Sequence, residues 1–167
     1  MFINHFNGNL KTLKHNSMAA NRVTLHRVLK ATPEKVYRAF ADSNAFSWWI
    51  PPYGFLCVIH HIEFKVGGSF KMSFINFTTG NSHSFGGNFL EIKPNKFIKY
   101  NDKFDDPNLP GELLTSVWLN KVSCGTELKI MQEGIPSVIP LEMCYLGWQE
   151  SLDKLKKLVE PEIPDNQ

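Results

Sequence analysis

Long apolar runs and blocks of like charge are missing from this sequence, and each absence excludes a class of protein. No stretch approaches the roughly 18 apolar residues of a membrane-spanning helix, so we expect no membrane span. The polar N-terminal stretch, residues 1–21, lacks the apolar core of a secretory signal, which favours a cytoplasmic location. The formal net charge is only +2 and no long Lys/Arg run occurs, so we expect no nucleic-acid partner.

Cysteine is scarce, and neither cysteine nor histidine occurs at the spacing of a metal site. The three cysteines, Cys57, Cys124 and Cys144, form no CxxC pair, so we expect small buried thiols in a reducing compartment, without disulfides or structural zinc. No HxH or HxxxH spacing occurs among the six histidines. The adjacent His60 and His61 should point to opposite faces of a strand and could not share one ion. We therefore expect no metal.

Motifs for nucleotide binding and nucleophilic catalysis are also absent. The pairs Gly67-Gly68 and Gly86-Gly87 belong to neither GxGxxG nor GxxxxGK[ST], and no GxSxG occurs. We therefore expect no cofactor and interpret both pairs as structural. Gly67-Gly68 predicts a turn, and Gly86-Gly87 predicts a bulge or sharp bend inside a strand.

Aromatic residues, by contrast, are abundant. They make up 13% of the chain and include 13 phenylalanines, whereas the hydrophobic (43%) and charged (20%) shares are ordinary for a globular protein. A length of 167 residues suits one domain with a sizeable core. Large rings fill such cores, but they also line apolar pockets.

The hydrophobic pattern changes period three times along the chain. Residues 22–30 alternate as a strand, and Thr32 with Pro33 then predicts the start of a helix that runs toward Phe40. Asp42 or Ser43 can cap a second short helix. Further strands are predicted at residues 55–64, 69–77, 82–93, 96–104, 112–122 and 126–133. Apolar residues at helical spacing predict a long helix over 141–159.

This order indicates an α+β fold, in which a curved antiparallel sheet of six to seven strands wraps around a long C-terminal helix. The domain is expected to span residues 22–160, with a flexible extension over 1–21 and a tail over 161–167. A strongly bent sheet presents a large concave apolar face. One helix can cover that face without filling it, so we expect an apolar cavity.

Four stretches carry a resemblance to a known family. They are ATPEKVYRAFADSNAFSWWIPP (31–52), FKVGGSF (64–70), GNFLEIKPNKFIKY (87–100), and Gly125–Gly134 with GWQESLDKLKKL (147–158). Together they resemble the helix-grip superfamily of START lipid-transfer domains and polyketide cyclases. Within it, the chain is similar to the SRPBCC branch related to the C-terminal domain of the heat-shock-protein ATPase activator, although Lys65 stands where arginine is usual. That superfamily includes co-chaperone domains, ligand carriers and enzymes, so the resemblance does not fix the function.

The cavity is the main functional candidate, and its expected ligand-binding residues are mostly aromatic. They are Trp48, Trp49, Phe70, Met72, Phe74, Phe85, Tyr100, Trp118, Met143 and Gly147, with Trp148 as a further lining residue. A glycine in the middle of a helix is unfavourable by about 1 kcal/mol relative to alanine. Close approach of a strand or a ligand would account for Gly147.

Three hypotheses remain open. The first is a cytoplasmic module that binds a hydrophobic or aromatic small molecule. The second is a cyclase- or hydrolase-type enzyme that uses His83 or Asp102 as acid and base. The third is a chaperone cofactor or stress-response protein that binds a protein partner near residues 48–53. The sequence leaves a monomer and a dimer equally open.

Overall fold

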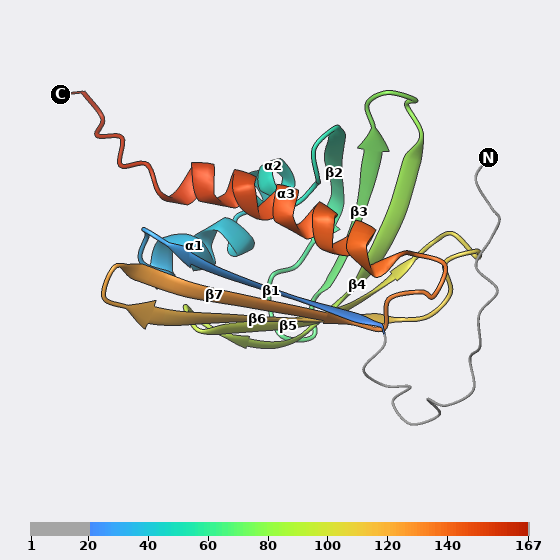
Figure 1. Cartoon of the computed structure of the whole chain (residues 1–167), viewed down its shortest axis with the longest axis horizontal. Coiled ribbons are helices and arrows are strands. Elements are labelled where there is room, and N and C mark those ends of the chain that lie inside the picture. Colours follow the sequence, from blue (N-terminus) through green and yellow to red (C-terminus); the bar gives the residue numbers. More distant parts are fainter. Residues whose placement is uncertain (1–20, 167) are drawn as a thin grey trace, which may run out of the picture.

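Seven antiparallel strands form one curved sheet, in the order β1-β7-β6-β5-β4-β3-β2, in a computed structural model that describes residues 21–166 (Figure 1). The strands are β1 (Arg22–Leu29), β2 (Phe55–Ile62), β3 (Ser69–Asn76), β4 (Ser82–Lys93), β5 (Phe97–Phe104), β6 (Leu113–Val122) and β7 (Gly125–Glu133). The helices are α1 (Pro33–Ala41), α2 (Ser43–Trp49) and α3 (Leu141–Val159). This arrangement confirms the α+β helix-grip fold. The extension expected over 1–21 lies, except for Asn21, outside the described residues.

The two short helices begin where their capping residues predict. The Thr32 hydroxyl accepts a hydrogen bond from the Lys35 backbone N–H at 3.3 Å, and proline occupies the first turn of α1. Asp42 follows α1 and caps α2, because its Oδ1 accepts from the backbone N–H groups of Asn44 (2.9 Å) and Ala45 (3.1 Å). These bonds satisfy amide groups that have no partner within a helix's first turn.

The glycine pair in β4 has a different role from the predicted bulge. Gly86 and Gly87 pair in regular register with β3, and the irregularity between β4 and β5 lies further on, between Phe89 and Glu91. A Cβ atom on Gly87 would lie 1.8 Å from the carbonyl oxygen of Asn101. The pair therefore lets neighbouring backbones approach one another where the sheet is strongly curved.

A bulge in β2 also changes the expected placement of two histidines. The register between β2 and β3 shifts between Ile59 and His61. His60 Nε2 shares a hydrogen bond with Ser73 Oγ (2.8 Å), and His61 Nε2 shares one with Ser69 Oγ (3.0 Å). Because these serines are four residues apart on one strand, both histidines contact the same face of β3. The prediction of opposite faces is wrong because a bulge breaks the alternation.

Two further observations concern the described part of the chain. Within residues 21–166, no helix has both the length and the apolarity required to cross a membrane, and no cluster of three potential metal ligands occurs.

Cys57 and Cys144 are half-buried, but Cys124 is exposed in the turn between β6 and β7. The prediction of three buried thiols is therefore wrong for Cys124.

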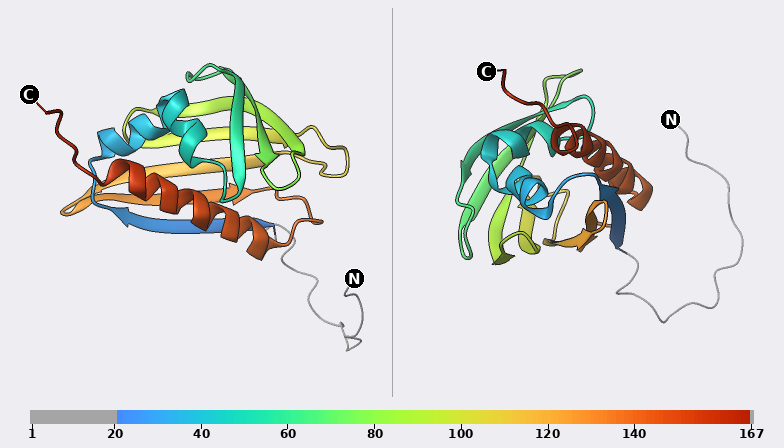
Figure 2. Two further views of the ribbon diagram at one scale, coloured as in Figure 1. Left: turned by 90° about the horizontal axis from the view of Figure 1, so that it is seen from above. Right: turned by 90° about the vertical axis from the view of Figure 1, so that its left-hand side faces the viewer.

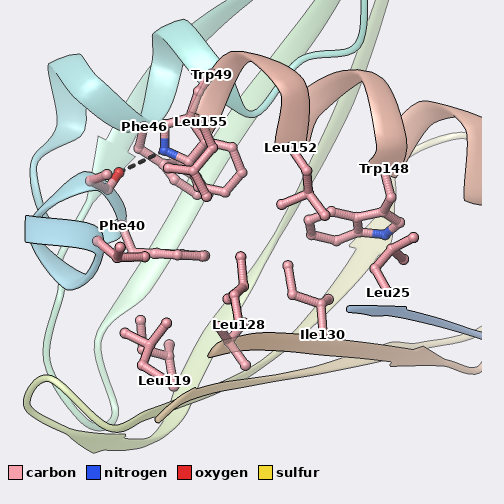
Figure 3. Packing of buried hydrophobic residues seen from close by; sticks show 14 of the residues in the cluster. Leu25, Phe40, Phe46, Trp49, Leu119, Leu128, Ile130, Trp148, Leu152 and Leu155 are labelled. Atoms are coloured by element: carbon pink, nitrogen blue, oxygen red, sulfur yellow. Dashed lines mark hydrogen bonds between the residues drawn. The ribbon is translucent and has the colours of Figure 1, made fainter. Parts of the chain in front are cut away.

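Helix α3 crosses the concave face of the sheet, and the sheet curves around it (Figure 2). Its C-terminal half packs with α1 and α2 into the main core (Figure 3). Leu155 and Trp49 are fully buried there, and the Trp49 indole N–H donates to the Ala39 carbonyl at 2.7 Å. Beyond the helix, the Lys35 ammonium group donates to the Pro161 carbonyl at 2.8 Å, which holds the start of the tail against α1.

Candidate functional site

The N-terminal half of α3 covers a cavity that side chains do not fill. The cavity has a volume of about 230 Å³ and lies between that half of the helix and strands β3 to β7. Its lining residues are Phe46, Ile50, Pro52, Phe70, Met72, Phe74, His83, Phe85, Phe89, Tyr100, Asp102, Phe104, Leu113, Gln132, Ile135, Ile139, Met143, Cys144, Gly147, Trp148 and Ser151. An apolar cavity of about 150 Å³ already accommodates benzene. The volume therefore suits a compact ligand of one or two rings.

Strand alternation brings the aromatic wall together. On β3, Phe70, Met72 and Phe74 share one face, as the sequence predicts, and all three line the cavity. The rings of Phe70 and Tyr100 meet edge to face at 5.7 Å between centroids. Those of Phe74 and Phe85 do so at 4.9 Å. Such contacts hold the rings in place without the presence of a ligand, so the wall is largely preformed.

Gly147 keeps the roof of the cavity open. A Cβ atom at this position would meet only the Pro52 side chain, at an ordinary distance of 3.9 Å. No strand approaches the helix here, so the explanation by a close strand is wrong. The residue lines the cavity. The missing side chain therefore leaves cavity space next to Trp148 rather than relieving a collision.

A glutamine provides a polar anchor that the sequence interpretation missed. Gln132 Oε1 accepts hydrogen bonds from the Trp148 indole N–H (3.0 Å) and from the Cys144 thiol (3.3 Å). Gln132 Nε2 donates to the Thr115 hydroxyl at 3.2 Å. The alternation of β7 could have revealed Gln132, because it occupies the next inward position after the buried Ile130. These bonds fix the Trp148 ring at the cavity edge.

Asp102 is the exceptional group in this cavity. Its side chain is buried, with 6% of the residue exposed, and its Oδ1 atom has no hydrogen-bond partner within the described chain. Burial, with the negative charge of Glu112 as a second cause, raises the pKa of the Asp102 carboxyl from its ordinary 3.8 to about 7. Burial and then the charge of Asp102 also raise the pKa of the Tyr100 hydroxyl. The cavity therefore holds one carboxyl group that is close to half ionised at neutral pH.

His83 and Asp102 both line the cavity, but they do not form a pair. Asp102 lies opposite Gly87 of β4, and His83 is four residues away from that glycine on the same strand. A strand rises about 3.3 Å per residue, so the backbone positions of the two residues are about 13 Å apart along the sheet. The imidazole is exposed at the cavity rim. A direct proton transfer between these two residues is therefore excluded in this conformation.

Seven of the ten residues expected to bind a ligand line the cavity: Phe70, Met72, Phe74, Phe85, Tyr100, Met143 and Gly147. The other three lie elsewhere. Trp48 is 51% exposed on the outer side of α2, because neighbouring residues of a helix point in different directions. Trp49 packs into the main core. Trp118 lies on the convex face of the sheet, beneath the Lys129 ammonium group at 5.7 Å, because its neighbours in β6 point inward.

Phe89 and Phe104 complete the aromatic wall and were not anticipated. Both could have been found from strand alternation. Phe89 lies four residues after Phe85 on β4, and Phe104 lies four residues after Tyr100 on β5. The α2 and loop residues that close the cavity carry no comparable periodic signal.

The fold and cavity define a helix-grip domain, and comparison with known proteins specifies its family. Residues 30–160 match the family model described as activator of Hsp90 ATPase homolog 1-like protein. The chain belongs to this family. No curated protein matches the chain.

Solved structures agree with this assignment. A protein from Chromobacterium violaceum is 52% identical, with a TM-score of 0.84, and the match covers 85% of this chain and 99% of that chain. A protein from Rhodobacter sphaeroides shares 20% identity at a TM-score of 0.72, over 85% of this chain and 93% of that one. A protein from Nitrosomonas europaea shares 19% identity at a TM-score of 0.69, and the match covers 83% of this chain and 93% of that chain. The last two show similarity of fold alone.

Proposed function

We propose that this is a small cytoplasmic protein that binds a hydrophobic or aromatic small molecule in the cavity beneath α3. The observation that carries the proposal is the cavity itself, which is lined mainly by aromatic and aliphatic side chains, with few polar groups among them. Ligand sites in proteins share this composition, since apolar walls supply affinity and a few polar groups fix orientation. Exposed Met143 at the rim adds a flexible side chain at the entrance.

Titration with a one-ring probe tests this proposal. We expect 2-phenylethanol to bind with a Kd of roughly 0.1–1 mM, as suits an unoptimised ligand of its size. Saturation-transfer NMR detects binding in this range. The matched control is Gly147→Leu, which places a side chain in the cavity where only Pro52 is near. Binding that is unchanged in this variant would show that the cavity is not the site, and no binding to the native protein would count against the proposal.

A smaller change at the same position separates stability from binding. We expect Gly147→Ala to raise the free energy of unfolding by about 1 kcal/mol, since alanine favours the helix and its methyl group meets no close neighbour. Affinity for 2-phenylethanol should fall at the same time, because the cavity becomes smaller. Urea unfolding measures the first effect. Gly125→Ala is the contrasting control and should destabilise, because φ is +145° there and the added Cβ would lie 2.0 Å from the Leu29 carbonyl.

A protein-interaction role is the second candidate. It is favoured by the family's description as like an activator of Hsp90 ATPase and by the exposed side chains of Trp48 and Tyr53 beside α2. Under this alternative, the chain would accelerate ATP hydrolysis by an Hsp90, and Trp48→Ala would reduce the acceleration. An unchanged ATPase rate over a range of protein concentrations would count against it.

An enzyme of the cyclase or hydrolase type has narrower support. The pKa of Asp102, raised to about 7 by burial, suits a general acid or base. The separation of Asp102 from His83 leaves it without a second acid or base at hydrogen-bonding distance. Binding without turnover is therefore the better-supported use of the cavity.

A further inference from the structure

We infer that the cavity selects a compact aromatic amine, and that Asp102 accepts the hydrogen bonds of the ligand's ammonium group. This inference rests on the proposed function, since it specifies the chemical class of the ligand that occupies the same cavity. It depends on the position of one unpartnered carboxylate oxygen, on the rings around it and on the charges near it.

The carboxyl group of Asp102 is placed to meet a ligand in the cavity. On β5 it lies between Tyr100 and Phe104, which share its face of the strand and line the same cavity. Across the ladder it is opposite Gly87 on one side and Leu113 on the other. Neither of these neighbours can donate a side-chain hydrogen bond. Oδ1 is therefore a buried acceptor without a hydrogen-bond partner in the described chain. Such an atom is energetically costly unless a donor on a ligand bonds to it.

Two other polar groups of the cavity, the Gln132 amide oxygen and the Ser151 hydroxyl, are already engaged, and His83 lies at the exposed rim. Gln132 Oε1 accepts from both Trp148 and Cys144. The Ser151 hydroxyl donates to the Ile50 carbonyl at 2.6 Å. A donor group on a ligand would therefore find Asp102 as the available strong acceptor.

The surroundings favour a cation over a neutral donor. Glu112, whose exposed side chain precedes β6, adds a second negative charge near Asp102. Aromatic faces attract cations, and one is close by. Phe70 of β3 lies opposite Gly87 of β4, and Gly87 in turn lies opposite Asp102 of β5. An ammonium group would neutralise the carboxylate and also benefit from the rings. The apolar remainder of the cavity would then hold the aromatic part of the ligand.

Asp102 is the group near the ligand that we expect to change its charge between pH 6 and pH 8. Burial raises the pKa of the Cys144 thiol on α3 to about 11, and burial likewise raises the pKa of the Tyr100 hydroxyl on β5. Both stay neutral in this range. Glu112, which is exposed and precedes β6, is the acidic neighbour that acts on Asp102, and His83 of β4 is the remaining titratable group that lines the cavity. His83→Gln therefore serves as the control for pH effects.

The test compares 2-phenylethylamine with its neutral isostere 2-phenylethanol and with phenylacetate. Calorimetric titration at pH 8 should show the amine binding about tenfold to a hundredfold more tightly than the alcohol, because a charge-assisted hydrogen bond replaces a neutral one. Phenylacetate should bind more weakly than the alcohol. In Asp102→Asn, a change of nearly equal size, the amine and the alcohol should bind with similar affinity.

A second arm needs no change at Asp102. The amine stays protonated throughout, whereas Asp102 becomes ionised, so amine affinity should rise about tenfold from pH 6 to pH 8 in the native protein and in His83→Gln. It should stay flat in Asp102→Asn. Equal affinity for amine and alcohol, or a preference that persists in Asp102→Asn, would overturn the inference while leaving cavity binding intact. Failure of all three probes to bind would overturn both.

Discussion

Asp102→Asn should remove a pH-dependent loss of stability that the native protein suffers between pH 4 and pH 8. The folded-state pKa of about 7 exceeds the ordinary 3.8, so the folded state binds the proton more tightly than the unfolded state. Stability linked to Asp102 is therefore fully present below about pH 4 and declines as the pH rises to 7. The shift corresponds to roughly 4 kcal/mol by the top of this range.

Urea unfolding of both proteins from pH 4 to pH 8 measures this effect. Asparagine resembles the neutral carboxyl in size and polarity, so the two proteins should have similar stability at pH 4 and diverge by roughly 4 kcal/mol at pH 8. Titrations of other groups cancel in the comparison. The exposed tail carboxyl of Asp165 gives the control, and Asp165→Asn should follow the native curve. Parallel curves for the native protein and Asp102→Asn would show that the carboxyl is not held neutral by burial.

Trp49→Ala should lower the free energy of unfolding by about 3–5 kcal/mol, the usual effect of emptying a buried aromatic position. The Trp49 side chain is fully buried and contacts the rings of Phe40 and Phe46 at 4.8 and 5.4 Å between centroids. It also donates a hydrogen bond to the Ala39 carbonyl, which the alanine variant leaves unpaired. This is a large part of the 5–15 kcal/mol that stabilises a typical domain.

The adjacent tryptophan supplies a matched control for this result. Trp48 is 51% exposed, so Trp48→Ala should change the stability by less than about 1 kcal/mol. Thermal or urea unfolding of the two variants, followed by circular dichroism, makes the comparison. Similar losses for both variants would contradict the assignment of Trp49 to the core and of Trp48 to the surface.

The arrangement of elements was largely predictable from local patterns. Pro33, Thr32 and Asp42 fix the short helices through caps that act within a few residues. Phe70, Met72 and Phe74 were correctly grouped because alternation places every second residue on one face. Signals of this kind are contained in the sequence itself.

The errors arose where position depends on distant parts of the chain. The bulge between Ile59 and His61 reversed the expected directions of neighbouring side chains, and no local residue announces it. The unusual state of Asp102 depends on burial beneath other elements and on Glu112, which lies in the loop before β6. The error at Trp118 has a different reason. The prediction followed its aromatic character, whereas the alternation of β6 places it on the face opposite to the buried Val117 and Leu119.

The most direct test of the central claim is amide and indole chemical-shift mapping of the native protein during titration with 2-phenylethanol. We predict saturable shifts concentrated in β3 to β6 and at the Trp148 indole N–H, with no comparable response in Gly147→Leu. That result would place the probe in the cavity beneath α3. Shifts confined to another surface, or a response that Gly147→Leu leaves unchanged, would contradict the account.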